Sequence, residues 1–224
     1  MKAGRPRVKL LKFDSYEEYK RIQTEVNRRK VKKVWVTDNE LVFVARFLQE
    51  HLPEVTFGLC HGVRNGYEVH KLRALLGVPV LGTEIAETAH QFPHVLQWDF
   101  HEVREEWIGN VDFIYSNSWD HSYDPERMLK NWMQCLRPHG RCFLQWTRDH
   151  DDHAVREADC FGLSLEEMLH WVTKDYDLEK IEYIQAVQYP RWGKMLKNLV
   201  KKGRRGIRVR TVCILVVKNR QERL

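Results

Sequence analysis

The sequence predicts an α/β fold with a mostly parallel seven-stranded sheet, helices on both faces and an antiparallel last strand. Short apolar runs alternate with amphipathic segments from residue 55 to residue 147. This alternation is typical of strand–helix–strand units with right-handed crossovers. The last two apolar runs have no long crossover helix between them, so we expect them to pair antiparallel at one edge. A chain of 224 residues is long enough for one such domain.

A glycine-bearing turn after the first strand is the feature around which the rest of the chain is organised. Residues 55–60 form an apolar run typical of a strand buried on both faces, and residues 66–76 have the period of an amphipathic helix. Gly62 and Gly66 lie between them. A helix N-terminus at a strand's carboxyl end offers free N–H groups to a ligand, and glycine lets a cofactor approach closely. The turn lacks the full G-x-G-x-x-G pattern, so a simple tight turn is the alternative.

Capping residues and apolar runs define the other elements. We expect two helices ahead of the sheet, and both should pack beside it. The predicted helices are 15–30 (capped by Ser15), 39–51 (capped by Asp38), 66–76, 126–136 (after Asp124 and Pro125), and 164–174 (capped by Ser164). The predicted strands are 55–60, 78–85, 95–98, 111–116, 141–147, 178–187 and 207–217.

Two regions follow from this order. Residues 1–54 form an N-terminal basic tail and the two helices, with residues 1–12 as a loose tail or edge. Residues 55–224 form the sheet domain, which includes a basic insert at 190–206.

The composition is that of a globular soluble chain. Apolar residues make up 43% and charged residues 30%. No apolar run approaches the roughly 18 residues that span a bilayer, and no signal peptide is evident, so we expect a cytoplasmic protein. Five cysteines, an odd number without C-x-x-C spacing, favour buried free thiols over a disulfide framework.

The positive charge is concentrated near the two ends of the chain. The net charge is +6 and the pI is about 9.0. A local basic surface attracts phosphate, acidic glycan, nucleic acid or membrane, although a solvated face is an equal alternative. Tyr189 and Trp192 lie beside the insert and could stack on a base or sugar, or pack against the sheet edge. The residues through which nucleic acid could bind are Lys194, Lys197, Lys201, Lys202, Arg204 and Arg205.

Two acidic residues fall at neighbouring strand ends. Glu84 follows the second strand and Asp99 the third. A carboxylate at the first position can accept both hydroxyls of a ribose, and one at the second could accept an adenine amino group. Phe100 could cover one face of a base. We expect both carboxylates to share one crevice; a capping acid and a turn residue are the alternatives.

The loop after the fourth strand, 117–125, carries the candidates for acid–base chemistry. Asp120 and His121 are those candidates, since histidine titrates near neutrality. Tyr123 could line an acceptor pocket or pack. Residues 150–153, His-Asp-Asp-His, could bind a metal, but ligands usually converge from separate elements, so we favour a solvated loop and predict no metal site.

The segment 111–140, with its Leu136-Arg-Pro-His-Gly turn, resembles the S-adenosylmethionine-dependent methyltransferases of the Rossmann-like class I superfamily. The resemblance covers roughly residues 55–147. In the first motif, Gly58 replaces the family's acid and Cys60 its first glycine. The resemblance implies S-adenosylmethionine as cofactor, with Glu84 on the ribose, Asp99 on the adenine, and His61 with Gly62 beside the methionine part. The full set of predicted cofactor-binding residues is Cys60, His61, Gly62, Glu84, Ile85, Trp98, Asp99, Phe100, Asn117 and Ser118. Tyr123 and Trp192 are the predicted substrate-binding residues.

The function expected from these observations is methyl transfer to a small or medium anionic acceptor, such as a saccharide or another metabolite. Two alternatives remain. One is an oxidoreductase or other nucleotide enzyme on the same scaffold. The other is a non-catalytic module that binds nucleic acid or an anionic glycan through residues 191–210.

Overall fold

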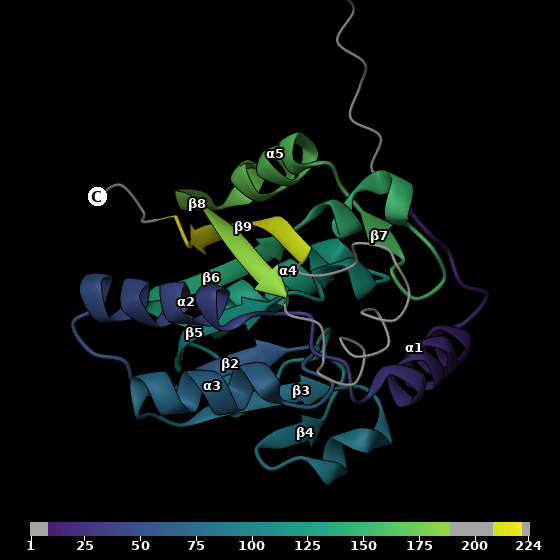
Figure 1. Cartoon of the computed structure of the whole chain (residues 1–224), viewed down its shortest axis with the longest axis horizontal. Coiled ribbons are helices and arrows are strands. Elements are labelled where there is room, and N and C mark those ends of the chain that lie inside the picture. Colours follow the sequence, from purple (N-terminus) through teal and green to yellow (C-terminus); the bar gives the residue numbers. More distant parts are fainter. Residues whose placement is uncertain (1–8, 189–207, 221–224) are drawn as a thin grey trace, which may run out of the picture.

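A seven-stranded sheet forms the middle layer of the molecule (Figure 1). The computed structural model describes residues 9–188 and 208–220. The strand order is β4-β3-β2-β5-β6-β9-β8; the first five strands are parallel, and β9 runs antiparallel to both of its neighbours. This confirms the predicted sheet and its antiparallel last strand. The strands are β2 (Gly58–His61), β3 (Val80–Glu84), β4 (Val95–Gln97), β5 (Val111–Ser116), β6 (Leu136–Trp146), β8 (Asp177–Gln188) and β9 (Arg208–Lys218).

Helices cover both faces of the sheet and bury two apolar clusters against it. Helices α2 (Asp38–His51) and α3 (Tyr67–Leu76) pack on the face that carries Cys60 and Phe113. Helices α4 (Pro125–Cys135) and α5 (Leu165–Asp175) pack on the opposite face. Side chains alternate along a strand, so Leu59 and Cys60 belong to different clusters. Short 3₁₀ helices span Glu87–Gln91, Glu105–Trp107, Trp119–His121, Arg148–His150 and Asp152–Ala154.

Helix α1 (Tyr16–Lys30) does not pack beside the sheet, so that expectation is wrong. It crosses the carboxyl ends of the parallel strands, where their arrowheads point in Figure 1. Asn27 bonds to Thr88, and Arg28 pairs with Glu87 at 2.5 Å. The helix begins after Ser15, whose hydroxyl accepts a bond from the backbone of Glu18, as predicted from its capping pattern.

Residues 9–11, just ahead of α1, pair with another part of the chain and so do not form a loose tail. Strand β1 (Lys9–Leu10) pairs antiparallel with β7 (Phe161–Gly162). The backbone N–H of Leu11 donates to the carbonyl of Cys160 at 2.8 Å. This two-stranded ribbon fixes the start of α1 over the end of the sheet.

Other boundaries differ from the predicted ones by a few residues. Thr37, not Asp38, caps α2, because Thr37 and Glu40 form a reciprocal capping box. Strand β6 already begins at Leu136, so the expected turn at 137–140 lies within an irregular strand beside β5. All five cysteines are buried free thiols, as predicted.

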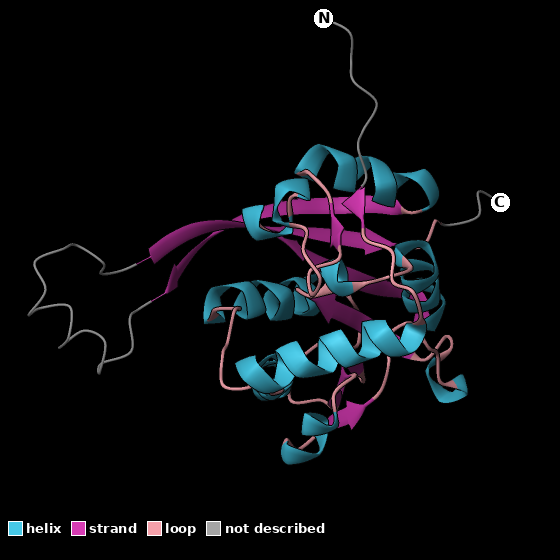
Figure 2. Cartoon of the chain, turned by 90° about the vertical axis from the view of Figure 1, so that its right-hand side faces the viewer, coloured by secondary structure: helices cyan, strands magenta, loops and turns pink. Residues whose placement is uncertain are grey.

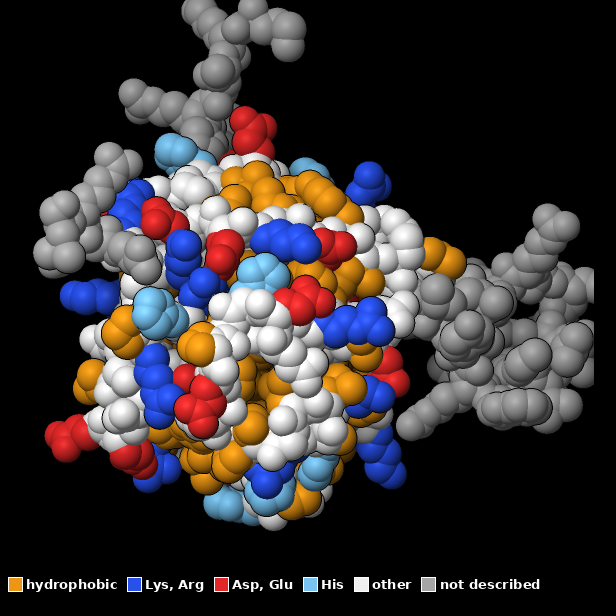
Figure 3. Space-filling view, turned by 90° about the vertical axis from the view of Figure 1, so that its left-hand side faces the viewer, with side chains coloured by type: hydrophobic (Ala, Val, Ile, Leu, Met, Phe, Trp, Pro, Cys, Tyr) orange, Lys and Arg blue, Asp and Glu red, His pale blue; other side chains and the backbone are white. Residues whose placement is uncertain are grey.

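Three further features concern the outermost strands, the basic insert and the surface of the molecule. Strands β8 and β9 extend away from the body as a hairpin (Figure 2). The basic insert 190–206, with Trp192 and its lysines and arginines, lies outside the described residues. On the side opposite the carboxyl ends, Lys and Arg are interspersed with Asp and Glu (Figure 3). No helix within the described part of the chain is both long and apolar enough to cross a membrane.

Candidate active site at the carboxyl ends of the strands

The loop between β2 and α3 turns sharply at the carboxyl edge of the sheet. The backbone N–H groups of Gly62 and Val63 both donate to the carbonyl of Thr83. Gly62 and Gly66 have φ of +72° and +70°, which glycine adopts without strain. A Cβ at Gly62 would lie 2.6 Å from Cβ of Ser118, and one at Gly66 would lie 2.7 Å from Val95. Both glycines are therefore required by packing within the protein itself.

Glu84 ends β3 and faces this loop. Its carboxylate accepts the backbone N–H of Arg64 at 3.0 Å and that of Ala86 at 3.1 Å. The residue is only 6% exposed, and burial raises the pKa of its carboxyl group. Among the described residues, no Lys, Arg or His side chain forms an ion pair with it, so two oxygens hold further lone pairs for a ligand. Arg64 adopts a φ of +50°, a strained value that places its N–H on the carboxylate.

Asp99 lines the same narrow cavity as Glu84. Its Oδ1 accepts bonds from the backbone and ring of His101, and its Oδ2 accepts one from Tyr16 at 2.8 Å. Burial opposes ionisation of Asp99, but these hydrogen bonds outweigh it and lower the pKa. The cavity between the two carboxylates also touches Gly62, Ile85, Phe100 and Ser118.

This narrow cavity has a volume of only about 40 Å³. Its far wall consists of Tyr19, Gln23, Val26 and Asn27, all from α1. Such a space holds about one water molecule, whose share of liquid volume is roughly 30 Å³. Helix α1 is therefore what fills the crevice that the two carboxylates share.

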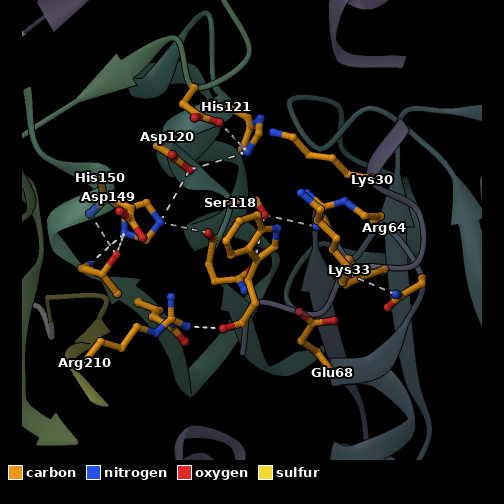
Figure 4. A pocket seen from close by; sticks show the side chains of 18 of the residues that line it. Lys30, Lys33, Arg64, Glu68, Ser118, Asp120, His121, Asp149, His150 and Arg210 are labelled. Atoms are coloured by element: carbon orange, nitrogen blue, oxygen red, sulfur yellow. Dashed lines mark hydrogen bonds and ion pairs between the residues drawn. The ribbon is translucent and has the colours of Figure 1, made fainter. Parts of the chain in front are cut away.

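A larger, charged cavity of about 260 Å³ adjoins the narrow one (Figure 4). Gly62, Arg64, Ser118 and His121 line both spaces. Five basic and four acidic side chains line the charged cavity. The basic ones are Lys30, Lys33, Arg64, Arg156 and Arg210, and the acidic ones are Glu68, Asp120, Asp149 and Asp159.

The two predicted acid–base residues, Asp120 and His121, lie in this charged cavity on the short helix after β5. His121 Nδ1 lies 2.9 Å from Gln23 Oε1, and its Nε2 lies 3.5 Å from Asp159 Oδ1. Burial lowers the pKa of His121 to about 4, so the ring is neutral at neutral pH. Asp120 is 4% exposed, and burial, with Asp159 nearby, raises its carboxyl pKa well above the ordinary value.

Several residues that line the charged cavity were not among the predicted site residues. Glu68 is buried in the first turn of α3; its Oε2 has no hydrogen-bond partner, and burial raises its pKa to about 7. His150 is also buried, and its Nε2 donates to the carbonyl of Asn117 at 3.2 Å. The sequence predicts that Glu68 lies in the first turn of this helix, but it does not predict the burial of Glu68, which depends on tertiary packing.

The side chains of four residues predicted to bind ligand lie outside both cavities. Cys60 points into the apolar core on the α2–α3 face. His61 stacks on Trp132 with ring centroids 4.6 Å apart, and burial lowers its pKa to about 3. Trp98 instead donates its indole N–H to the carbonyl of Glu102, and Tyr123 packs on Tyr19 in an outer groove. The alternation of side chains along a strand explains why Cys60 points into the core. Local packing explains why the side chains of His61, Trp98 and Tyr123 lie outside the cavities.

The arrangement of sheet and helices is the class I S-adenosylmethionine-dependent methyltransferase fold. No protein-family model matches the sequence, and no curated protein matches it. Solved structures do match over most of the chain. One is the 1,6-didemethyltoxoflavin N1-methyltransferase of Burkholderia thailandensis, with bound 1,6-didemethyltoxoflavin and S-adenosylhomocysteine. It is 11% identical, covers 99% of this chain and 98% of its own, and has a TM-score of 0.64.

Two further structures share this fold. The N-methyltransferase NodS of Bradyrhizobium japonicum, in complex with S-adenosylhomocysteine, is 14% identical, covers 89% of this chain and 99% of its own, and has a TM-score of 0.57. A possible histamine N-methyltransferase of Thermotoga maritima is 13% identical, covers 92% of this chain and 99% of its own, and has a TM-score of 0.52. At these identities the likeness is one of fold.

Proposed function

We propose that this protein is an enzyme that transfers a methyl group from S-adenosylmethionine to a small anionic acceptor. The observation that carries the proposal is Glu84, a buried carboxylate at the end of the second parallel strand. A buried carboxylate is costly unless donors satisfy its oxygens, and the donors of Glu84 are backbone N–H groups, among them those of Arg64 and Ala86. Each oxygen has a further lone pair, so the two hydroxyls of a ribose would add hydrogen bonds to this carboxylate.

The groups around Glu84 suit the rest of the cofactor. Ile85, Asp99 and Phe100 line the side where the base would lie. Arg64, which lines both cavities, would attract the carboxylate of the methionine part. The cofactor supplies an electrophilic methyl group on its sulfonium sulfur, and the chain's role is to hold that methyl group and the acceptor in line.

The narrow cavity is too small to hold adenosine while α1 lies across it. Cofactor binding would therefore require α1 to move outward or its side chains to rotate away. The helix is held by the buried side chains of Tyr19 and Ile22, by polar links such as Tyr16 to Asp99, and by the two-residue β1–β7 pairing. Each polar link contributes about 1 kcal/mol, so the cofactor would have to offset these links and the exposure of the buried side chains.

The charged cavity favours an anionic acceptor. Two of its four carboxyl groups, those of Glu68 and Asp120, have raised pKa values. Asp159 is already paired with Arg156. Arg210 is likewise paired with Glu40. Lys30 and Lys33 therefore supply the positive charge that would attract a carboxylate or phosphate on the acceptor.

The experiment is a turnover assay with S-adenosylmethionine and matched pairs of metabolites that differ in one carboxylate or phosphate. Release of S-adenosylhomocysteine, measured by mass spectrometry, should occur with anionic members and be reduced by Lys33→Ala. The matched control is Lys20→Ala on the exposed side of α1. Turnover only with neutral acceptors would overturn the acceptor class. Thermal stabilisation by nicotinamide cofactors and not by S-adenosylhomocysteine would overturn the proposed activity.

A further inference from the structure

Three acceptor atoms converge at one wall of the charged cavity. One ligand atom from each of Asp120, His121 and Asp159 lies within 4.8 Å of the other two. His121 Nε2 is 4.0 Å from Asp120 Oδ1 and 3.5 Å from Asp159 Oδ1. Asp120 and His121 come from the short helix after β5, whereas Asp159 comes from the segment just before β7. Figure 4 shows Asp120 and His121 turned toward each other across this wall. Convergence from two separate elements is what a ligand site requires.

Hydrogen bonds around His121 determine which ring nitrogen carries the proton. The amide nitrogen of Gln23 donates to the carbonyl of Ala158 at 2.8 Å, which fixes Gln23 Oε1 as an acceptor. His121 Nδ1, 2.9 Å from that oxygen, must therefore be the donor. In the neutral ring, Nε2 then presents a bare lone pair to the carboxylates. Metal-binding histidines are held in this way by a partner on the other nitrogen.

The two carboxylates also present free lone pairs to the same point. Asp120 Oδ1 is buried and has no hydrogen-bond partner. Asp159 bonds through Oδ2 to Arg156, so its Oδ1 is the oxygen that lies 3.5 Å from His121 Nε2. Three lone pairs that face one another repel unless a proton or a cation lies between them.

We propose that Asp120, His121 and Asp159 bind a divalent transition-metal ion. Bonds of about 2.0–2.2 Å at angles near 90–120° place ligand atoms roughly 3.0–3.7 Å apart, so Asp120 must move closer to the other two residues to bind the same ion. One imidazole with two carboxylates suits Mn²⁺, Co²⁺ or Zn²⁺. Its remaining positions would face the charged cavity, where the ion could bind an anionic oxygen. This site does not depend on the proposed methyl transfer.

The neighbouring histidines do not belong to the ligand set. His150 lies 3.8 Å from Asp120 Oδ1, but its Nδ1 accepts the backbone N–H of Thr147 and its Nε2 donates to Asn117. Neither nitrogen has a lone pair left for a metal. His153 is largely exposed and lies near Asp151, so its removal is the matched control.

The test uses the full chain, stripped with a chelator and titrated with Co²⁺ alone. We expect visible d–d absorption bands and a single binding event by calorimetry. Asp159→Asn and His121→Ala should each weaken Co²⁺ binding by at least tenfold, while His153→Ala leaves it unchanged. Gln23→Met, which removes the hydrogen bond to Nδ1, should weaken binding roughly tenfold.

Asp159→Asn keeps the shape of the side chain, so it remains informative if His121→Ala does not fold. Absence of the absorption bands in the wild-type protein would overturn the proposal. Equal loss of binding in His153→Ala would also overturn it, because the ion would then lie in the loop 150–153. S-adenosylhomocysteine binding is measured separately, so failure of one proposal leaves the other distinguishable.

Discussion

The hydroxyl of Tyr16 donates a 2.8 Å hydrogen bond to Oδ2 of Asp99, 83 residues further along the chain. This bond joins the first helix to the carboxylate at the end of β4. It also occupies one of the two oxygens of the carboxylate that we predict to accept an adenine amino group. The same contact therefore fastens α1 over the crevice and competes with the proposed cofactor.

Removing that hydroxyl should improve cofactor binding. In Tyr16→Phe, Asp99 Oδ2 becomes available and α1 loses one link, so we expect S-adenosylhomocysteine to bind about three- to tenfold more tightly by calorimetry. This corresponds to the roughly 0.5–1.5 kcal/mol of one hydrogen bond. Tyr67→Phe is the matched control, since its hydroxyl bonds to Asp38 and neither residue lines the two cavities. A tenfold loss of affinity in Tyr16→Phe alone would contradict this role.

The buried Glu68 should make stability depend on pH. Its pKa of about 7 in the folded protein exceeds the ordinary 4.5, so the folded state keeps a proton that the unfolded chain loses between these values. Stability therefore falls as the pH rises from about 4.5 to 7 and levels off above. The total fall is roughly 3 kcal/mol.

Glu68→Gln measures this effect directly. The amide stays neutral, so the variant should have a higher free energy of unfolding than the wild type at pH 8 and nearly the same at pH 5, measured by urea denaturation. Glu54→Gln, at an exposed position, should show no such difference. A Glu68→Gln variant that is less stable at pH 8 would mean that the carboxylate is stabilised by a contact other than those described.

Two glycines at the ends of α3 separate backbone strain from close packing. Gly66 and Gly77 have nearly the same positive φ, but a Cβ at Gly66 would lie 2.7 Å from Val95, whereas one at Gly77 meets nothing within 4 Å. Gly77→Ala should cost about 1 kcal/mol from strain alone. Gly66→Ala should cost about 2–4 kcal/mol, since overpacking adds about 1–3 kcal/mol. Equal losses in chemical denaturation would refute the packing role of Gly66.

Local patterns were sufficient to predict most of the fold. The sheet follows from the alternation of apolar runs and helices, and the helices begin at capping residues such as Ser15, Asp124 and Ser164. The place of α1 could not be read in this way. Its position depends on long-range bonds, such as Gln23 to Ala158, that no local pattern encodes.

The site was predictable in part for the same reason. Strand-end residues such as Glu84, Asp99 and His121 line the two cavities, because parallel strands bring their carboxyl ends to one edge. Cys60 and His61 were assigned from motif position, but packing directs their side chains into the core. Lys30 and Arg210 reach the cavity from elements distant in sequence, so only the folded chain reveals them.

The most direct test of the proposed function is calorimetric titration of S-adenosylhomocysteine into the wild-type protein and Glu84→Ala. We expect micromolar binding by the wild type and a loss of roughly 10- to 100-fold in the variant, because a hydrogen bond to a charged group contributes about 1.5–3 kcal/mol. Glu54→Ala is the exposed control and should bind like the wild type. Absence of binding to the wild-type protein, or equal affinity in Glu84→Ala, would contradict the proposal that this carboxylate holds the cofactor's ribose.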